Sequence, residues 1–149
     1  QCPTDPAQPP VVREMNHHQG AYTQRHNWAL TCYGNYGYTA AGAEHQECDD
    51  EYFPDGSRTG KAIFTFEGVA PGLYSVFVGG RHTENRNPAG ARFVVDGHAK
   101  VINQKHPSGA YVWDHHGDWC LGGTVTAELD STVNNGSDSV MGIRLVPKP

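Results

Sequence analysis

Long apolar segments are absent from this sequence of 149 residues. No run approaches the roughly 18 residues of a membrane-spanning helix, so we expect no transmembrane segment. Helical periodicity is missing as well, and a hydrophobic fraction of 37% with 18 Gly and 10 Pro argues against a helical bundle. Basic runs are also lacking. With 11 Lys and Arg against 16 Asp and Glu, nucleic acid is not an expected partner.

The residue patterns of common catalytic sites are missing too. The sequence has no GxSxG or HExxH motif, and no Cys–His pair that we expect to stay reduced. A glycosidase needs two carboxylic acids, but any chain of this length offers such pairs, so they carry no signal. We therefore predict a non-enzymatic protein without catalytic residues.

Four cysteines are present, and none of them forms the CxxC pair of a zinc ribbon or a thioredoxin-like site. An even number of cysteines, in a chain that begins with Gln rather than Met, is typical of a processed, secreted protein with disulfides. Three pairings are possible. We favour Cys32–Cys48, which closes a local loop, together with Cys2–Cys120, which would pin the N-terminal segment. The expected location is extracellular or at the cell surface.

The length suits one domain, and we expect residues 1–15 to form an extended Pro-rich arm and residues 16–149 to form a single domain. Short segments rich in β-branched and aromatic residues recur along the chain, separated by turn signals. They predict strands at 28–33, 61–66, 73–78, 91–95, 100–103, 124–129 and 139–146. This spacing predicts an all-β fold, an antiparallel β-sandwich.

The connections between these strands alternate in length. Short turns are predicted at 69–72, 96–98 and 130–137, and longer polar connections at 39–60, 81–90 and 104–119. Successive strands of an antiparallel sandwich run in opposite directions, so alternate connections emerge at the same end. The three long connections should therefore share one end and form the functional surface.

The stretch from residue 61 to residue 147 carries a family resemblance. Its motifs are, in order, a Gly-Xaa-Tyr turn (72–74), a polar loop with Asn residues (84–87), the segment Val-Ile-Asn-Gln (101–104), a Trp followed by Leu-Gly (119–122) and a closing Ser-Asp-Ser-Val (137–140). This pattern resembles the golvesin C-terminal-like domain, the carbohydrate-binding-like domain of xanthan lyases. The resemblance implies a jelly-roll, galactose-binding-like β-sandwich of the kind appended to secreted enzymes that act on polysaccharides.

One polar run supplies most of the predicted ligand-binding residues. They are Arg81, His82, Glu84, Asn85, Arg86 and Asn87. Sugars require planar, bidentate donors and acceptors, which Arg, Asn and Glu side chains provide. The same side chains would alternatively bond the backbone of their own loop, with Asn87-Pro88 starting a turn.

Two tryptophans lie close together in the third long connection. An exposed Trp offers a flat apolar face to a sugar ring, and we predict that Trp113 is such a platform, with His115 and His116 beside it. Trp119 matches the Trp of the resembled family and is expected to pack in the core.

Metal binding has two candidate groups, although no other cofactor is expected. The candidate ligands are Asp114, His115, His116 and Asp118 for zinc or copper, and Asp49 and Asp50 for a structural calcium ion. No HxH or HxxxH spacing supports the first group, and the second lacks the spacing of an EF-hand. Solvated side chains are the alternative for both groups.

Three functions remain in competition. The first is a secreted, non-catalytic module that binds extracellular polysaccharide through the loops at one end of the sandwich. The second is a structural subunit of an extracellular fibre or surface assembly, in which residues 1–12 pair with the sheet edge of a neighbouring copy. The third is a metal-binding protein that uses the histidine-rich loop. The family resemblance places them in that order.

Overall fold

The computed structural model describes residues 1–17, 60–131 and 136–149 with their side chains, and, between residues 18 and 59, the backbone of five short strands. The described strands are β1 (Arg13–Asn16), β2 (Ala21–Gln24), β3 (Trp28–Thr31), β4 (Tyr38–Ala40), β5 (Ala43–His45), β6 (Asp49–Tyr52), β7 (Lys61–Arg81), β8 (Ala91–Val95), β9 (His98–Ile102), β10 (Tyr111–Asp130), β11 (Asp138–Val140) and β12 (Gly142–Pro147). The predicted all-β class is therefore confirmed. No helix suited to crossing a membrane occurs among the described residues.

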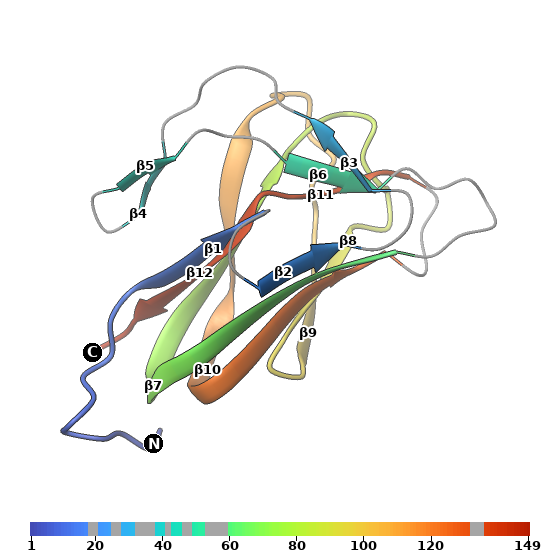
Figure 1. Cartoon of the computed structure of the whole chain (residues 1–149). Helices are drawn as coiled ribbons and strands as arrows, with labels where there is room; N and C mark the ends of the chain where they lie inside the picture. Colours follow the sequence, from blue (N-terminus) through green and yellow to red (C-terminus); the bar gives the residue numbers. More distant parts are fainter. Residues whose placement is uncertain are drawn as a thin grey trace.

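One antiparallel sheet dominates the molecule. Its order is β1-β12-β7-β10-β8-β9, with β2 added beside β7. The long strands β7 and β10 pair from Arg81–Tyr111 to Lys61–Asp130, and both bend back in the middle (Figure 1). The sheet therefore folds over itself into two layers. The first layer holds β1, β12 and the adjoining halves of β7 and β10, and the second holds their other halves with β2, β8 and β9.

The bend in β7 and β10 corrects two sequence expectations. Residues 69–72 do not form a tight turn between two strands, because β7 continues through them and reverses its direction by bending. Gly68 and Gly123, with φ of 63° and 73°, supply the left-handed backbone that two ordinary strand residues would resist. Register shifts on both sides of Gly123 place this kink inside the ladder, as β-bulges do.

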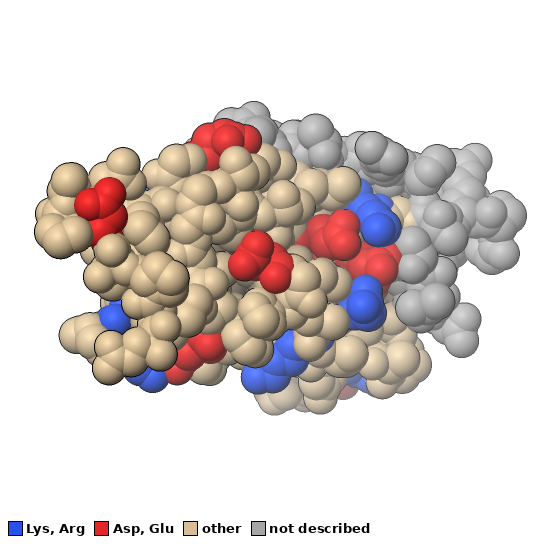
Figure 2. Space-filling model, turned by 90° about the horizontal axis from the view of Figure 1, so that it is seen from below, with Lys and Arg blue, Asp and Glu red and all other residues tan. Residues whose placement is uncertain are grey.

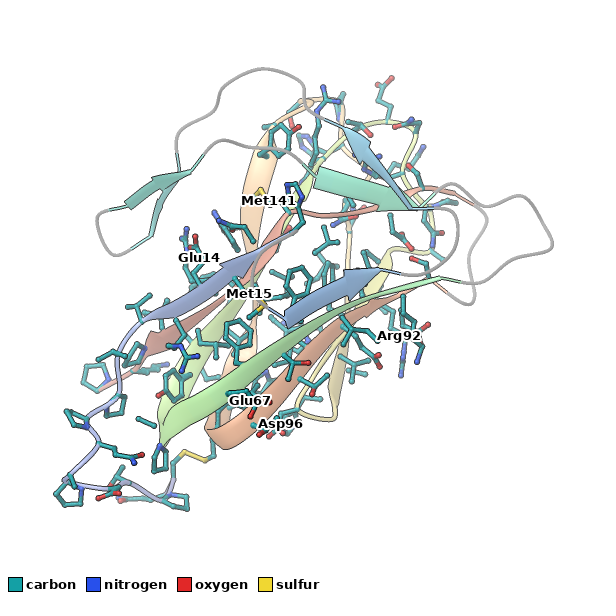
Figure 3. All side chains as sticks on the ribbon, viewed as in Figure 1. Glu14, Met15, Glu67, Arg92, Asp96 and Met141 are labelled. Atoms are coloured by element: carbon teal, nitrogen blue, oxygen red, sulfur yellow. A yellow bond between two sulfur atoms is a disulfide. The ribbon has the colours of Figure 1, made fainter. Side chains whose placement is uncertain are left out.

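The space between the layers is filled by the alternating pattern of the strands. Ala62, Phe64 and Phe66 are buried, as the sequence predicts, whereas the residues between them are partly exposed. The facing layer contributes a matching apolar row that includes Tyr74 and Val76. Burial of one large apolar side chain stabilises the fold by about 1.5–3 kcal/mol, so this core dominates folding. In strand β1 the side chains alternate in direction, with Met15 packed on the core and Glu14 on the other face (Figure 3), although all four residues of β1 are partly exposed.

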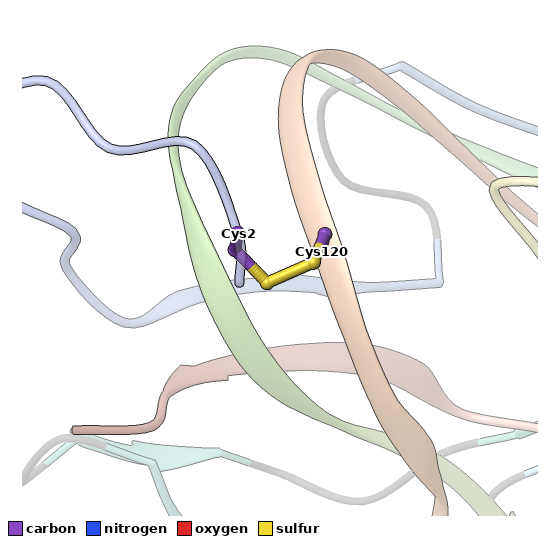
Figure 4. The surroundings of a disulfide bond; sticks show 2 residues. All are labelled: Cys2 and Cys120. Carbon is purple, nitrogen blue, oxygen red and sulfur yellow. A yellow bond between two sulfur atoms is a disulfide. The ribbon is translucent and has the colours of Figure 1, made fainter.

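The N-terminal arm is attached at the bend. The predicted disulfide Cys2–Cys120 is present, with 5.2 Å between the two Cα atoms (Figure 4). The guanidinium of Arg13 donates to the backbone oxygen of Glu67 at 3.0 Å and lies 5.9 Å from the ring centre of Phe66. Because β1 begins at Arg13, the last residues of the segment expected as an arm belong to the sheet. The other predicted disulfide, Cys32–Cys48, falls outside the described residues.

The underside of the molecule in Figure 1 shows no concentration of one charge. Figure 2 shows this face with acidic and basic side chains interspersed among a larger uncharged area. On the outer face of the second layer Lys61 lies 3.6 Å from Glu128, and Arg92 lies 3.0 Å from Asp130. Partly exposed pairs of this kind contribute little to stability, about 0–1 kcal/mol each.

Candidate functional site

Two connections meet at the end of the sandwich opposite the bend, called here the loop end: residues 82–90 and 103–110. Thr83 and Lys105 form a β-bridge, and the backbone nitrogen of His106 donates to the oxygen of Thr83 at 3.0 Å. The nitrogen of His82 donates to the oxygen of Ala110 at 2.8 Å. The sequence argument that these two connections share one end is therefore confirmed, whereas the connection predicted at 39–60 instead overlaps strands β4, β5 and β6.

The connection 130–137, predicted as a short turn at the other end, in fact reaches the loop end. Residues 111–119, expected in a long loop, belong to strand β10. Without this strand, the order of the predicted strands places the connection 130–137 at the end opposite the long connections. The structure places its described part at the loop end, where Arg86 forms a β-bridge with Ser137.

A shallow pocket of about 500 Å³ opens between the two loops, lined by Glu84, Lys105, His106 and Pro107. The ammonium of Lys105 donates to the backbone oxygen of Glu84, which ties one wall of the pocket to the other. The pocket thus combines a carboxylate, an ammonium, an imidazole and an apolar ring. Such a set can both donate hydrogen bonds to hydroxyl groups and accept them.

His82 and Asp114 form a partly buried polar pair near the pocket residue His106. The Nε2 atom of His82 lies 2.8 Å from a carboxylate oxygen of Asp114, and the His82 side chain is only 11% exposed. The rings of His82 and His106 are 6.2 Å apart. Arg81 reaches the same loop, since its Nε donates to the oxygen of Gly109 at 3.0 Å. Strand β10 and both loops are thereby joined.

Arg86 and Asn87, predicted to bind ligand, are instead buried supports of the loop. They are 2% and 3% exposed. The Arg86 guanidinium donates to the oxygen of Arg81 and to the hydroxyl of Ser137, both at 2.8 Å. The Asn87 amide donates to the oxygen of Gly90 at 3.1 Å. The alternative that these side chains bond their own loop therefore describes them correctly, because neither has surface to offer a ligand.

The loop end also contains buried polar residues that the sequence analysis did not single out. Gln104 pairs with the backbone of Ser139, donating at 2.7 Å and accepting at 3.0 Å, as a strand residue would. Gly80 is required there, since a Cβ would lie 2.5 Å from the Gln104 amide nitrogen. Asp138 accepts from the hydroxyl of Ser131 at 2.7 Å. Burial raises the Asp138 pKa to about 6, although hydrogen bonds to it and the charge of Arg86 act in the opposite direction.

Trp113 does not lie on a loop and is not an open platform. It faces Gly79 across the β10–β7 ladder, and its ring lies over Gly79 and Gly142, where a Cβ would approach it to 3.0 Å. The guanidinium of Arg144 lies 4.1 Å from the ring centre and covers it. Arg144 in turn donates to a carboxylate oxygen of Glu14 at 2.7 Å. The structure therefore gives Trp113 a packing role.

The two neighbouring histidines point to opposite sides of β10. His115 is exposed and lies 3.0 Å from Asp118, which also accepts from Ser75 at 2.7 Å and from Lys148 at 2.6 Å. These donors hold the pKa of Asp118 below its usual range, Lys148 most of all. His116 is fully buried on the inner side. Two ring systems that face apart cannot hold one ion together.

The predicted zinc or copper group is thus dispersed, with Asp114 bound to His82 and Asp118 on the outer face. Within the described ranges no group of three or more potential ligands has the arrangement of a metal site. Calcium binding at Asp49 and Asp50 stays a prediction, because the side chains of β6 lie outside the described residues.

Comparisons with known proteins show which solved structures share this fold. No protein-family model matches the sequence, and no curated protein matches it either. Among solved structures, a Paenibacillus xanthan lyase superposes with a TM-score of 0.72 at 20% identity, over 93% of this chain and 13% of the lyase. A family 35 carbohydrate-binding module from Clostridium thermocellum gives 0.56 at 13% identity, over 91% of this chain and 99% of the module.

The fold is shared with family 35 carbohydrate-binding modules. A Podospora anserina β-(1,4)-mannanase that carries such a module matches with a TM-score of 0.56 at 14% identity, over 93% of this chain and 28% of that one. The resemblance to the xanthan-lyase domain is therefore confirmed for the fold. The chain spans a small part of the two enzymes and nearly the whole of the isolated module.

Proposed function

We propose that this chain is a non-catalytic carbohydrate-binding module that binds polysaccharide at the loop end. The observation that carries the proposal is the pocket lined by Glu84, Lys105, His106 and Pro107, formed by two loops that are bonded to each other and supported by buried side chains. A pre-formed pocket avoids much of the entropy cost of ordering loops around a ligand. The family 35 fold and the match to xanthan lyase support a glycan as the ligand.

The pocket suits hydroxyl-rich ligands better than it suits a reaction. Its lining holds one carboxylate, Glu84, whereas most glycosidases place two carboxylic acids around the scissile bond. The Asp114 carboxylate behind it is bound to His82. Lys105 and His106 donate to hydroxyl oxygens, Glu84 accepts from hydroxyl groups, and such paired contacts orient a sugar ring.

A secreted location is part of the proposal. The disulfide Cys2–Cys120 supports it, since disulfides persist in oxidising compartments. The same bond argues against exchange of the N-terminal arm between copies, because it ties Cys2 to strand β10 of its own domain. A fibre subunit built by arm exchange is therefore the less supported alternative.

Binding of the purified, oxidised chain to soluble polysaccharides, including xanthan and β-(1,4)-mannan, tests the proposal by calorimetry. We expect Lys105→Ala and His106→Ala each to weaken binding about tenfold, because each removes a hydrogen bond that a charged or polar group makes. Lys100→Ala is the matched control, since Lys100 is exposed on β9 away from the pocket.

Two outcomes would contradict the proposal. Binding that is lost in His115→Ala but kept in Lys105→Ala would move the site to the outer face of the sheet. If the chain bound no polysaccharide of the panel, the proposed carbohydrate-binding function would be wrong.

A further inference from the structure

His116 occupies a bulge in β10, between His115 and Gly117, where the pairing with β7 shifts register. Its side chain is fully buried, at 0% exposure. The Nε2 atom lies 3.0 Å from the backbone oxygen of Phe93 in β8. The Nδ1 atom lies 2.9 Å from the indole Nε1 of Trp119.

These two contacts fix the position of the proton on the imidazole ring. A carbonyl oxygen only accepts hydrogen bonds, so the Nε2 atom of His116 carries the hydrogen. An indole N–H only donates, so Nδ1 carries none. The neutral ring satisfies both partners. A second proton on Nδ1 would set one N–H against another and would leave a charge inside the protein, so the imidazolium does not fit.

Trp119 extends this contact to the other layer. Its ring stacks on His98 of β9, with 4.0 Å between the ring centres and 4° between the planes. It also lies so close to Gly117 that a Cβ there would be 2.3 Å away. His116 and Trp119 belong to the half of β10 in the first layer, whereas Phe93 and His98 belong to the β8–β9 hairpin of the second.

We propose that His116 is a proton-operated clasp between the two layers of the sandwich. The neutral ring holds Trp119 against the β8–β9 hairpin. Protonation breaks the hydrogen bond from the indole, and Trp119 then leaves its stack on His98. The clasp lies apart from the loop-end pocket, so it does not depend on the proposed ligand.

The groups around His116 favour its neutral form. Burial is the main cause that lowers its pKa, and the neighbouring Lys100, His98 and His115 lower it further, while the Phe93 carbonyl raises it. Lys100 and His98 come from β9 and His115 from β10 itself, whereas β8 presents a carbonyl and the paired segment of β7 presents apolar side chains on this side. The charges that lower the His116 pKa therefore come from two strands, β9 and β10.

The direction of the pH effect follows from the lowered pKa. A histidine whose pKa falls on folding stabilises the folded state above its unfolded value of 6.5, and this contribution is lost as the pH falls. The clasp should therefore be closed at neutral pH and open in acid. A module that enters an acidic medium would loosen on this side while its core stays folded.

Nuclear magnetic resonance of the Trp119 indole N–H during a pH titration tests the clasp. In the wild-type chain we expect this hydrogen to exchange slowly at neutral pH and at least about tenfold faster, relative to the Trp113 indole, once the pH is well below 6.5. Far-ultraviolet circular dichroism on the same sample should stay unchanged, which separates opening of the clasp from unfolding.

His116→Gln is the matched variant, because the Gln amide offers one acceptor and one donor and does not titrate. We expect the Trp119 signal of this variant to become insensitive to pH. A wild-type signal that is unaffected by acid would overturn the proposal, as would a transition that persists in His116→Gln and vanishes in His98→Ala. Nitrogen chemical shifts of the wild-type ring test it without any variant, since they must report hydrogen on Nε2 alone at neutral pH.

Discussion

The two ends of this sandwich are closed by opposite kinds of interaction. At the bend, the layers are joined by the continuous strands β7 and β10, by the disulfide Cys2–Cys120 and by apolar side chains such as Val69 and Leu121. At the loop end, the segments are joined by buried polar groups, among them Arg86, Gln104 and Asp138.

Burying polar groups costs more free energy than burying apolar ones, because each polar group must recover the hydrogen bonds that it made with water. The loop end meets this condition, since Arg86 and Gln104 bond to neighbouring segments and Asn87 bonds to the backbone of its own loop. Directional bonds of this kind fix loops in one conformation more strictly than apolar contacts do. The loop end is therefore built for a defined surface and the bend for stability.

Removing Arg86 should have the largest effect. Arg86→Met leaves the buried Asp138 without its cationic neighbour and the loop without two hydrogen bonds. We expect the free energy of unfolding to fall by about 3–5 kcal/mol, as when one partner of a buried ionic pair is deleted. Urea unfolding measures this. Arg92→Met, which breaks a partly exposed pair with Asp130, is the control and should cost no more than about 1 kcal/mol. If both variants lost the same free energy of unfolding, Arg86 would matter no more to stability than the pair between Arg92 and Asp130.

Breaking the disulfide should weaken the bend and spare the site. Replacing both Cys2 and Cys120 by Ser frees a closure between residues 118 apart in the sequence, and we expect a loss of about 2–4 kcal/mol. Polysaccharide affinity, measured well below the melting temperature, should stay unchanged. A weaker affinity in the folded variant would show that the two ends are coupled.

Asp138 should give the loop end a pH dependence of its own. Its pKa is raised from 3.8 to about 6, so its contribution to stability is full below 3.8 and is lost as the pH rises through about 6. Asp138→Asn should remove most of this change, about 1–3 kcal/mol between neutral and mildly acidic solution. Urea unfolding at both pH values, in a His116→Gln background, excludes the opposite effect of His116. An unchanged pH dependence in Asp138→Asn would assign it to another group.

The sequence predicts the strands better than it predicts their continuity. Alternation of apolar residues identifies the buried face of β7 at Phe64 and Phe66 because one side of the strand meets the core. The polar segment 111–119 has no such alternation, since part of it faces the loop network, and the bulge at His116 shifts the register. Gln104 carries no local signal at all, because its partner Ser139 is 35 residues away.

The smallest expected effect distinguishes two glycines, one from each end. Gly97 lies in the β8–β9 turn near the bend with φ of 82°, and Gly109 lies in the loop 103–110 with φ of 66°. Alanine at either position meets the same left-handed strain, so each variant should lose about 1 kcal/mol of stability. Gly109 belongs to the loop that carries the pocket residues Lys105 and His106, whereas Gly97 lies outside the pocket. We therefore expect Gly109→Ala to weaken polysaccharide binding severalfold and Gly97→Ala to leave it unchanged, as calorimetry on both variants would measure. Equal affinities would mean that the position of this loop does not matter to the ligand, and would place the binding surface elsewhere on the sandwich.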